Sequence, residues 1–420
     1  MTGSKGKVDE KKVERSRSFD LGYIRGLDGI RGVALIMVLL IHGKVAWMTG
    51  GFYAVDVFFV LSGFLITSLL LIEYQKRRDI SLKKFWIRRS LRLFPALALA
   101  MLGITLYVLF FLDSGRRAGE LYEIFTAVTY HNNWIMALTS NRGNFPVLVG
   151  HTWSLSIEMQ FYLLWPLIVL GVIAVMRWRL KRRPEIRGVA IAVMGTALVL
   201  GLASIVTRTV LAHSGTDWWR IYGGTDTHVD GLLAGCVIAC IAILGGLRRW
   251  PQWLGIAGLL GIVALVIPTF LMDPFAIQWG FTLVTLSATA LIGSVAAGHP
   301  ISRLFALTPF VFLGRISYST YLWHWPVYLV VLPVGWEVSV PHLILAMAIS
   351  ISLGTASYYL VEIRALRLKR RFERTQAGEE TVEAQISLTD RFSTNREQSV
   401  RPGSSGEQQT TLTEAPQYRS

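Results

Sequence analysis

Long apolar runs recur along the chain, with few charged residues inside them. A helix of roughly 20 apolar residues is long enough to cross the hydrocarbon core of a bilayer. Pro and Gly inside such runs (Pro166, Gly235 and Pro326) are tolerated, because neighbouring helices satisfy the freed backbone groups. The pattern therefore predicts an all-α, polytopic membrane helix bundle of about ten transmembrane helices. The predicted spans are 28–47, 53–73, 94–112, 155–175, 188–208, 229–246, 252–271, 278–297, 311–332 and 342–362.

Lys and Arg gather in alternate connections between these spans. The basic segments are 1–26, 76–92, 177–187, 248–249 and 364–371, whereas 48–52 and 333–341 contain no Lys or Arg. Basic residues favour the cytoplasmic side of a membrane. The alternation therefore predicts an even number of spans, with both termini in the cytoplasm.

Composition supports this interpretation and excludes other protein classes. Of the 420 residues, 52% are apolar and only 16% are charged, against roughly 25% charged in soluble domains. A soluble enzyme, a disordered chain and a secreted disulfide scaffold are therefore excluded. The net charge of +15 is explained by basic loops on one membrane face rather than by nucleic-acid binding. Cys236 and Cys240 lie one turn apart in an apolar span and are expected to be core or lipid-facing residues.

The chain divides into three parts by composition. Residues 1–26 form a basic cytoplasmic segment without the features of a cleavable signal peptide. Residues 27–363 form the membrane domain. Residues 364–420 begin with a basic run and continue as a polar tail with few aromatic residues, which we expect to be disordered. No internal repeat is apparent, which weakens a transporter interpretation.

The first span contains three ionisable residues, which are costly inside a membrane and are therefore candidates for function. Arg31 and His42 are eleven residues apart, so they share a helix face at a separation of roughly 16 Å along the axis. Asp28 lies within about 60° of both residues. The alternative is an Asp28–Arg31 ion pair at i,i+3 together with a hydrogen-bonded core histidine.

The second span places a carboxylate at the depth of His42. His42 and Asp56 lie seven residues on either side of a turn near Thr49. A carboxylate beside an imidazole fixes its tautomer and stabilises the imidazolium, as a general base requires. The alternative is that Asp56 caps the outer end of the second span. Ser62 and Gly63 are more typical of helix packing than of a nucleophile.

Two arginines and a carboxylate mark the third and fourth spans. Arg89 and Arg92 share a face at i,i+3, where their guanidinium groups suit phosphates or simply anchor the loop at the membrane. His151 and Glu158 lie seven residues apart on one stripe of the fourth span. Glu158 either pairs with a polar partner inside the membrane or interacts with the helix dipole.

The ninth span contains a polar stripe formed by Ser317, Tyr321 and His324. Buried histidines of this kind serve as hydrogen-bonded core residues or as acid–base groups. The pattern favours a structural role for His324 slightly over a catalytic one. Asp226 and Asp230, at the start of the sixth span, are best explained as acids at a helix N-terminus.

Together these segments resemble the acyltransferase-3 family of integral-membrane acyltransferases. The motifs occur in the family's order and cover residues 27–362. Where the family often has a second Glu after the one in the fourth span, this chain has Met159, so the resemblance rests there on Glu158 alone. The matching motifs are Leu27-Asp28-Gly29-Ile30-Arg31-Gly32 with His42, Asp56-Val57-Phe58-Phe59-Val60-Leu61-Ser62-Gly63-Phe64, Arg88-Arg89-Ser90-Leu91-Arg92, His151-Thr152-Trp153-Ser154-Leu155-Ser156-Ile157-Glu158 and Tyr321-Leu322-Trp323-His324-Trp325-Pro326.

The resemblance implies a reaction and its participants. An acyl group, often acetyl, would pass from cytoplasmic acyl-CoA to a hydroxyl of an envelope glycan, a lipid-linked sugar or a secondary metabolite. The resemblance implies that Arg31 and His42 are essential for activity. It also implies that Arg89 and Arg92 bind CoA. The chain resembles the stand-alone type without a hydrolase-like domain. We expect acyl-CoA as co-substrate, no metal and no nucleic-acid partner, in a multi-pass protein of the cell membrane.

These residues suggest a mechanism. The arginines hold the CoA phosphates at the cytoplasmic mouth, and His42 takes the proton of the acceptor hydroxyl as it attacks the thioester. Asp56 or Glu158 orients the imidazole. The sequence leaves open whether transfer is direct or passes through an acyl-histidine. The competing class is a proton-coupled secondary transporter, in which the buried His and carboxylates form a proton relay.

Overall fold

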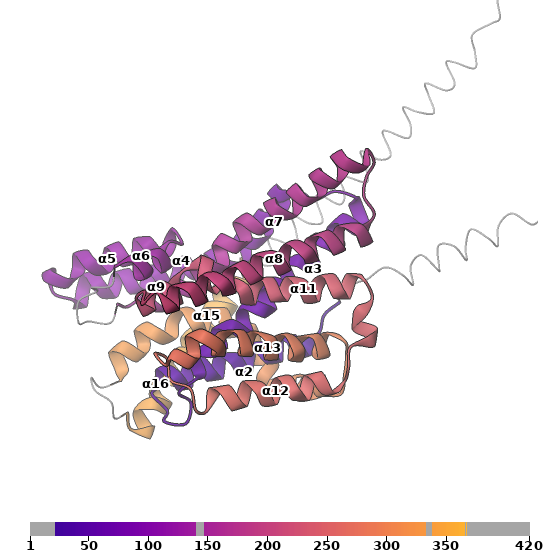
Figure 1. Ribbon diagram of the computed structural model, residues 1–420. Coiled ribbons are helices and arrows are strands. Elements are labelled where there is room, and N and C mark those ends of the chain that lie inside the picture. Colours follow the sequence, from indigo (N-terminus) through magenta and orange to yellow (C-terminus); the bar gives the residue numbers. More distant parts are fainter. Residues whose placement is uncertain (1–21, 140–146, 333–337, 366, 368–420) are drawn as a thin grey trace, which may run out of the picture. The chain divides into compact units, whose positions relative to one another are not determined.

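The computed structural model describes residues 22–139, 147–332, 338–365 and 367 (Figure 1). These residues contain helices and no strand, so the all-α prediction is confirmed for them. The long helices are α2 (Arg25–His42), α3 (Ala54–Arg77), α4 (Leu82–Phe111), α7 (Trp153–Leu180), α8 (Ile186–His213), α11 (Asp230–Ile243), α12 (Trp253–Val266), α13 (Phe281–Ala296), α15 (Thr308–Val331) and α16 (Val340–Ser357).

Shorter elements connect these helices. They are η1 (Gly51–Tyr53), α5 (Ser114–Val128), α6 (Asn132–Leu138), η2 (Gly150–Thr152), α9 (Trp218–Gly223), α10 (Thr225–His228), η3 (Gly246–Arg249), η4 (Ala276–Gly280), α14 (Ile301–Phe305) and η5 (Tyr358–Glu362). The apolar pattern did not predict α5, α6, α9 or α10, because they are too short or too polar to register as spans.

Each of the ten predicted spans contains a helix, but these helices differ in their capacity to cross a membrane. Six helical segments in the described part of the chain are long and apolar enough to do so. Helices α11 and α12 have 14 residues each, or about 21 Å, against a hydrocarbon core of roughly 30 Å. The six segments are Gly51–Arg77, Leu82–Phe111, Gly150–Leu180, Ile186–His213, Ala276–Ala296 and Val340–Ala365.

Helices α2 and α15 are not among the six, because both carry polar groups. Helix α2 has Arg25, Asp28 and Arg31 among its 18 residues, and α15 carries Ser317 and His324. These two helices hold much of the candidate chemistry. The count of ten spans and the cytoplasmic termini therefore remain predictions, and most of the predicted terminal segments, 1–21 and 368–420, lie outside the described residues.

Helices α2 and α15 approach each other closely through glycine. A Cβ atom at Gly314 would lie 1.7 Å from the carbonyl oxygen of Asp28, and a Cβ at Gly32 would lie 2.0 Å from that of Phe310. Only glycine permits such backbone contact, which is the common mode of helix packing inside a membrane. The contact fixes the polar stripe of α15 against α2.

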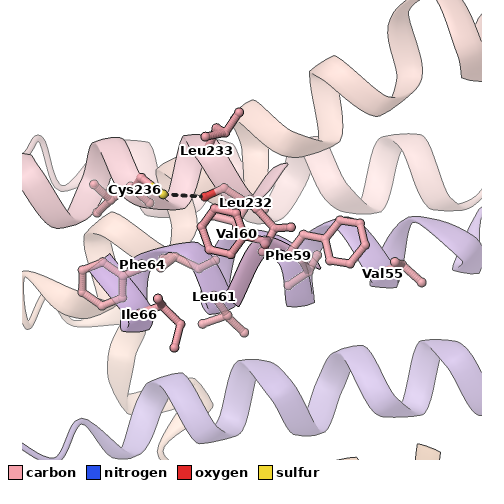
Figure 2. Close-up of a cluster of buried hydrophobic side chains, with 14 of the residues drawn as sticks. Val55, Phe59, Val60, Leu61, Phe64, Ile66, Leu232, Leu233 and Cys236 are labelled. Atoms are coloured by element: carbon pink, nitrogen blue, oxygen red, sulfur yellow. Dashed lines mark hydrogen bonds between the residues drawn. The ribbon is translucent and has the colours of Figure 1, made fainter. Parts of the chain in front are cut away.

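Helices α3 and α11 pack in the same way. A Cβ at Gly63 would lie 1.8 Å from the carbonyl oxygen of Leu232, which confirms the packing role expected of Gly63. Figure 2 shows the apolar side chains between the two helices, with the thiol of Cys236 donating to the carbonyl of Leu232 at 3.2 Å. Cys236 and Cys240 are both buried and free, so they are core residues as expected.

The outer surface of helix α8 is apolar along its length. Leu198, Val199, Leu202, Val206 and Val210 are each more than half exposed. A soluble protein rarely exposes such a continuous apolar face, whereas a bilayer solvates it. Together with the six apolar helices, this surface identifies a multi-pass membrane protein.

The segment between α4 and α7 folds back onto the bundle. Asp113 caps α5 by accepting from the backbone N–H groups of Gly115 and Arg116 at 3.0 and 3.2 Å. Buried Glu120 of α5 accepts from the backbone N–H of Leu148 at 3.1 Å. This bond holds the chain just before η2. In the same segment the carbonyl of Val147 accepts from the indole N–H of Trp325 in α15.

Candidate functional site

A cavity of about 80 Å³ lies among α2, α3, α4, α7 and α15. Five predicted site residues line it, although they are far apart in the sequence: Arg31, Arg89, Arg92, Glu158 and Tyr321. The remaining lining residues are Val55, Phe58, Phe59, Ser62, Leu93, Ser154, Leu155, Ser317 and Tyr318. The cavity therefore combines cationic groups, one carboxylate and several hydroxyls with an apolar wall supplied mainly by α3.

The three arginines share this cavity. Arg92 is close enough to Arg31 and Arg89 for their charges to repel. Within the described residues Arg31 and Arg92 form no hydrogen bond or salt bridge, and Nε of Arg89 is buried without a partner. Three neighbouring guanidinium groups with unused donors form a site for a multiply charged anion such as a phosphate.

Glu158 connects to these arginines through Tyr162, which was not predicted from the sequence. Arg89 donates to the hydroxyl of Tyr162, and that hydroxyl donates to Glu158. Ser62 also donates to Glu158, so Ser62 belongs to the site rather than to a helix interface. Glu158 is the sixth residue of α7, beyond the first turn to which the helix dipole is confined. Its hydroxyl partners therefore explain its burial better than the dipole does.

A second unpredicted residue, Glu362, borders the arginines. It is buried in η5 and accepts from the hydroxyl of Ser319. It also lies close enough to Arg92 for their opposite charges to attract. The sequence signal was a carboxylate at the end of the last apolar span.

His42 pairs with another histidine. Nδ1 of His42 lies 3.0 Å from Nε2 of His324, and Nδ1 of His324 lies 2.5 Å from the carbonyl oxygen of Tyr321. The indole of Trp325 packs edge-on against the His42 ring at 4.8 Å between ring centroids. Tyr321 therefore connects the pair to the cavity, which neither His42 nor His324 lines.

His151 lies beside the pair without a hydrogen bond of its own. Its ring centroid is 5.2 Å from those of Tyr321 and His324, and both of its ring nitrogens are buried and unpartnered. Its backbone carbonyl accepts from the Tyr321 hydroxyl at 2.8 Å, and that hydroxyl also bonds to Ser154 at 2.8 Å. The rings of His42 and His151 therefore both lie against that of His324.

The expectation that Asp56 orients His42 is wrong. Asp56 Oδ1 bonds to Nε2 of His228 at 3.0 Å, and the hydrogen-bond partners of Glu158 are Ser62 and Tyr162 rather than His42. Helix α2 ends at His42, and the next eleven residues form turns and η1. The hairpin is therefore not symmetric about Thr49, and Asp56 faces α10 and α11.

Asp56 and His228 belong to a separate buried network. Arg208 makes two bonds to Asp230, at 2.8 and 3.0 Å, and none of the four side chains is more than 3% exposed. This network joins α3, α8, α10 and α11. Neither Arg208 nor His228 was predicted from the sequence; the available signal was an arginine at the end of the otherwise apolar predicted span 188–208.

Asp28 lies outside the cavity. It accepts from the hydroxyl of Tyr23 at 2.8 Å, and that hydroxyl also accepts from Arg315 at 3.1 Å. The alternative Asp28–Arg31 ion pair is therefore not formed. Among the described residues no group of three or more His, Cys, Asp or Glu side chains is arranged to hold a metal ion.

Comparisons with known proteins agree with the motifs. The chain is 32% identical over 371 residues to the peptidoglycan O-acetyltransferase OatA of Listeria monocytogenes, covering 83% of this chain and 57% of that protein. It is 34% identical to the putative peptidoglycan O-acetyltransferase YrhL of Bacillus subtilis, covering 81% and 54%. It is 33% identical to the O-acetyltransferase OatA of Staphylococcus aureus, covering 76% and 53%.

The chain thus spans about half the length of the curated relatives it matches. No solved structure matches the chain. The model of the Acyl_transf_3 family, described as an acyltransferase domain, matches residues 24–359, which include every motif described above. The chain therefore belongs to the acyltransferase-3 family.

Proposed function

We propose that this protein is a membrane O-acyltransferase that moves an acyl group, acetyl in the first instance, from acyl-CoA to a hydroxyl. One observation carries the proposal. A single cavity brings Arg31, Arg89 and Arg92 together with Glu158 and Tyr321, and the His42–His324 pair is hydrogen-bonded to the backbone carbonyl of Tyr321.

The arginines suit the donor. CoA carries phosphates, and guanidinium groups bind phosphate through paired N–H donors. Along α2 the distance from Arg31 to His42 is roughly 16 Å, a span of the order of an extended pantetheine arm. Phosphates held at Arg31, Arg89 and Arg92 would therefore leave the thioester near His42. The basic loops favour a cytoplasmic entrance for this donor.

His42 is the proposed general base. It would take the proton of the acceptor hydroxyl as that oxygen attacks the thioester carbonyl, and it would then return the proton to the departing CoA thiolate. A thioester C–S bond is broken and an ester C–O bond is formed. An acyl-histidine intermediate remains an alternative path through the same residue.

Glu158 has a different proposed role from His42. As a carboxylate that accepts from Ser62 and Tyr162, it holds Tyr162 against Arg89 and so shapes the anion site. Asp56 is not part of the proposed machinery, because its partner is His228 in the separate network.

The acceptor is proposed from the relatives. Two of them are named peptidoglycan O-acetyltransferases, one of these as putative, which favours the hydroxyl of an envelope glycan. A lipid-linked sugar or a secondary metabolite would supply the same chemical group. The transporter alternative is disfavoured by membership of the acyltransferase family.

The proposal is tested with the full chain reconstituted in lipid nanodiscs. Acetyl-CoA labelled in the acetyl group is added with peptidoglycan fragments, and thiol release and labelled glycan are followed together. We expect acetyl-CoA to be consumed and its label to appear in an ester that mild alkali removes. Intact acetyl-CoA, together with solute uptake driven by a pH gradient in proteoliposomes, would instead establish a transporter.

A further inference from the structure

We propose that His324 is a positioning residue that fixes the tautomer of His42 and directs its basic nitrogen toward the reaction. The inference rests on the proposed function, in which His42 is the general base. It assigns to a second histidine the role that a carboxylate performs in a Ser-His-Asp triad.

The tautomers follow from the hydrogen-bond chain. A backbone carbonyl only accepts, so the contact of 2.5 Å between Nδ1 of His324 and the Tyr321 carbonyl requires a proton on that nitrogen. The Nε2 atom of a neutral His324 then has a lone pair and can only accept. The bond of 3.0 Å to Nδ1 of His42 therefore requires His42 to donate. Nε2 of His42 is left with the lone pair that a base needs.

The surroundings hold both rings in place. His324 is fully buried in α15, whose backbone is fixed against α2 at Gly314. The hydroxyl of Tyr328 donates to the carbonyl of Leu39 in α2 at 3.0 Å. Trp325, which packs on His42, donates from Nε1 to the carbonyl of Val147 at 2.8 Å. The chain of two histidines is therefore anchored from α2, α15 and the segment before η2.

A neutral imidazole suits this position better than a carboxylate does. Burying an isolated charge in the membrane interior is costly, and the rings of Tyr321 and His151 lie 5.1 and 5.2 Å from that of His324 between centroids. Neutral His324 accepts from His42 without adding a charge. When His42 takes a proton, the same bond stabilises the imidazolium, because Nδ1 of His42 donates in both of its protonation states.

The test compares two substitutions of His324. In His324→Gln the side-chain oxygen can stand near the position of Nε2 and accept from His42, whereas in His324→Leu that side-chain acceptor is lost. We expect kcat of His324→Gln to remain within about tenfold of the wild-type value. We expect kcat of His324→Leu to fall by about 10²–10⁴-fold, which is the loss typical of a catalytic histidine held in the wrong tautomer. KM for acetyl-CoA should be nearly unchanged.

A second measurement does not depend on turnover. Nitrogen-15 spectra of histidine-labelled protein in bilayers distinguish protonated from bare ring nitrogens, and the signals of His42 are assigned by their loss in His42→Gln. We expect one tautomer of His42, protonated at Nδ1, in wild type and in His324→Gln, and a mixture in His324→Leu.

The outcomes separate this inference from the proposed function. Wild-type protein that shows the single tautomer without transferring acyl groups would refute the function and leave the tautomer assignment standing. Equal loss of activity in His324→Gln and His324→Leu, or a single tautomer retained in His324→Leu, would overturn the positioning role. Wild-type turnover in His324→Leu would overturn it as well.

Discussion

The guanidinium group of Arg89 lies over the ring of Tyr162, with 3.9 Å between the guanidinium carbon and the ring centroid, and it also donates to the hydroxyl of that ring. Because the same hydroxyl donates to Glu158, one side chain links the cationic part of the cavity to its carboxylate. A change at Tyr162 should therefore affect donor binding more than the fold.

Tyr162→Phe removes the hydroxyl and keeps the ring. Arg89 retains its cation–π contact but loses its acceptor, so its guanidinium becomes less well positioned. We expect KM for acetyl-CoA to rise by about tenfold to a hundredfold, in line with the loss of one hydrogen bond to a charged group. Steady-state kinetics in nanodiscs measure this change.

Tyr74→Phe is the matched control. The Tyr74 hydroxyl is also buried, but it donates to the carbonyl of Pro184 at 2.7 Å, away from the cavity. An equal rise in KM in both variants would mean that loss of any buried hydroxyl loosens the bundle, which would contradict the specific role of Tyr162.

Arg89→Ala combined with Arg92→Ala should raise KM for acetyl-CoA more than KM for the glycan acceptor. The two guanidinium groups line the cavity beside Arg31 and suit the phosphates of the donor. Initial rates measured over both substrate concentrations separate the two constants.

Arg88→Ala, at the position directly before Arg89, is the control for loss of an arginine in this segment. Arg88 pairs with Glu73 at 2.8 Å and does not line the cavity. It should leave both KM values close to wild type. If the double variant weakened donor and acceptor equally, the arginines would be serving the fold rather than the donor.

The orientation of the chain is testable by labelling. The charge pattern predicts 48–52 on the outer side and 177–187 in the cytoplasm. Single cysteines placed in each segment, in a chain whose Cys236 and Cys240 have been replaced, should react with a membrane-impermeant thiol reagent only at 48–52 in intact cells. Reaction at 177–187 would reverse the orientation and the proposed entrance of acyl-CoA.

The sequence located the helices because long apolar runs have a single stable arrangement in a bilayer. It also identified the five cavity residues from Arg31 to Tyr321, because ionisable or polar side chains stand out against apolar neighbours. A helix-packing role for Gly63 was likewise expected from its small size. Features that depend on the residues of a single helix could therefore be predicted from the sequence.

Hydrogen-bond partners that lie on different helices could not be predicted in the same way. Assigning Asp56 to His42 required a symmetric turn, and the turn residues and η1 between α2 and α3 broke that symmetry. His228 lies 172 residues from Asp56, and no periodicity relates two such positions. The contribution of Tyr162 depends on which way α7 faces, which packing against α3 and α4 decides.

Asp56→Ala should lower the stability of the folded protein more than it lowers kcat. The substitution leaves His228 without its partner and disturbs a buried network that includes Arg208 and Asp230. Breaking a buried charged pair costs about 3–5 kcal/mol. Thermal unfolding in detergent should therefore shift downward, while kcat per folded molecule should stay near wild type. A large loss of kcat at unchanged stability would return Asp56 to the catalytic residues.

His42→Ala should fold and insert normally yet lose transfer by about 10²–10⁴-fold, the contribution typical of a positioned acid–base group. Stability should change little, because His42 is the last residue of α2 and is only partly buried. His42→Gln separates hydrogen bonding from proton transfer. Its amide nitrogen can still donate to Nε2 of His324, but an amide takes up no proton at neutral pH.

We therefore expect His42→Gln to be as inactive as His42→Ala while binding acetyl-CoA with wild-type affinity, because Arg31, Arg89 and Arg92 are untouched. Equilibrium binding of labelled acetyl-CoA, measured beside turnover, tests both parts. Near-normal turnover in His42→Gln would make His42 a structural partner of His324. The base would then have to be sought at Glu158, the one carboxylate that lines the cavity among the described residues, or at His324.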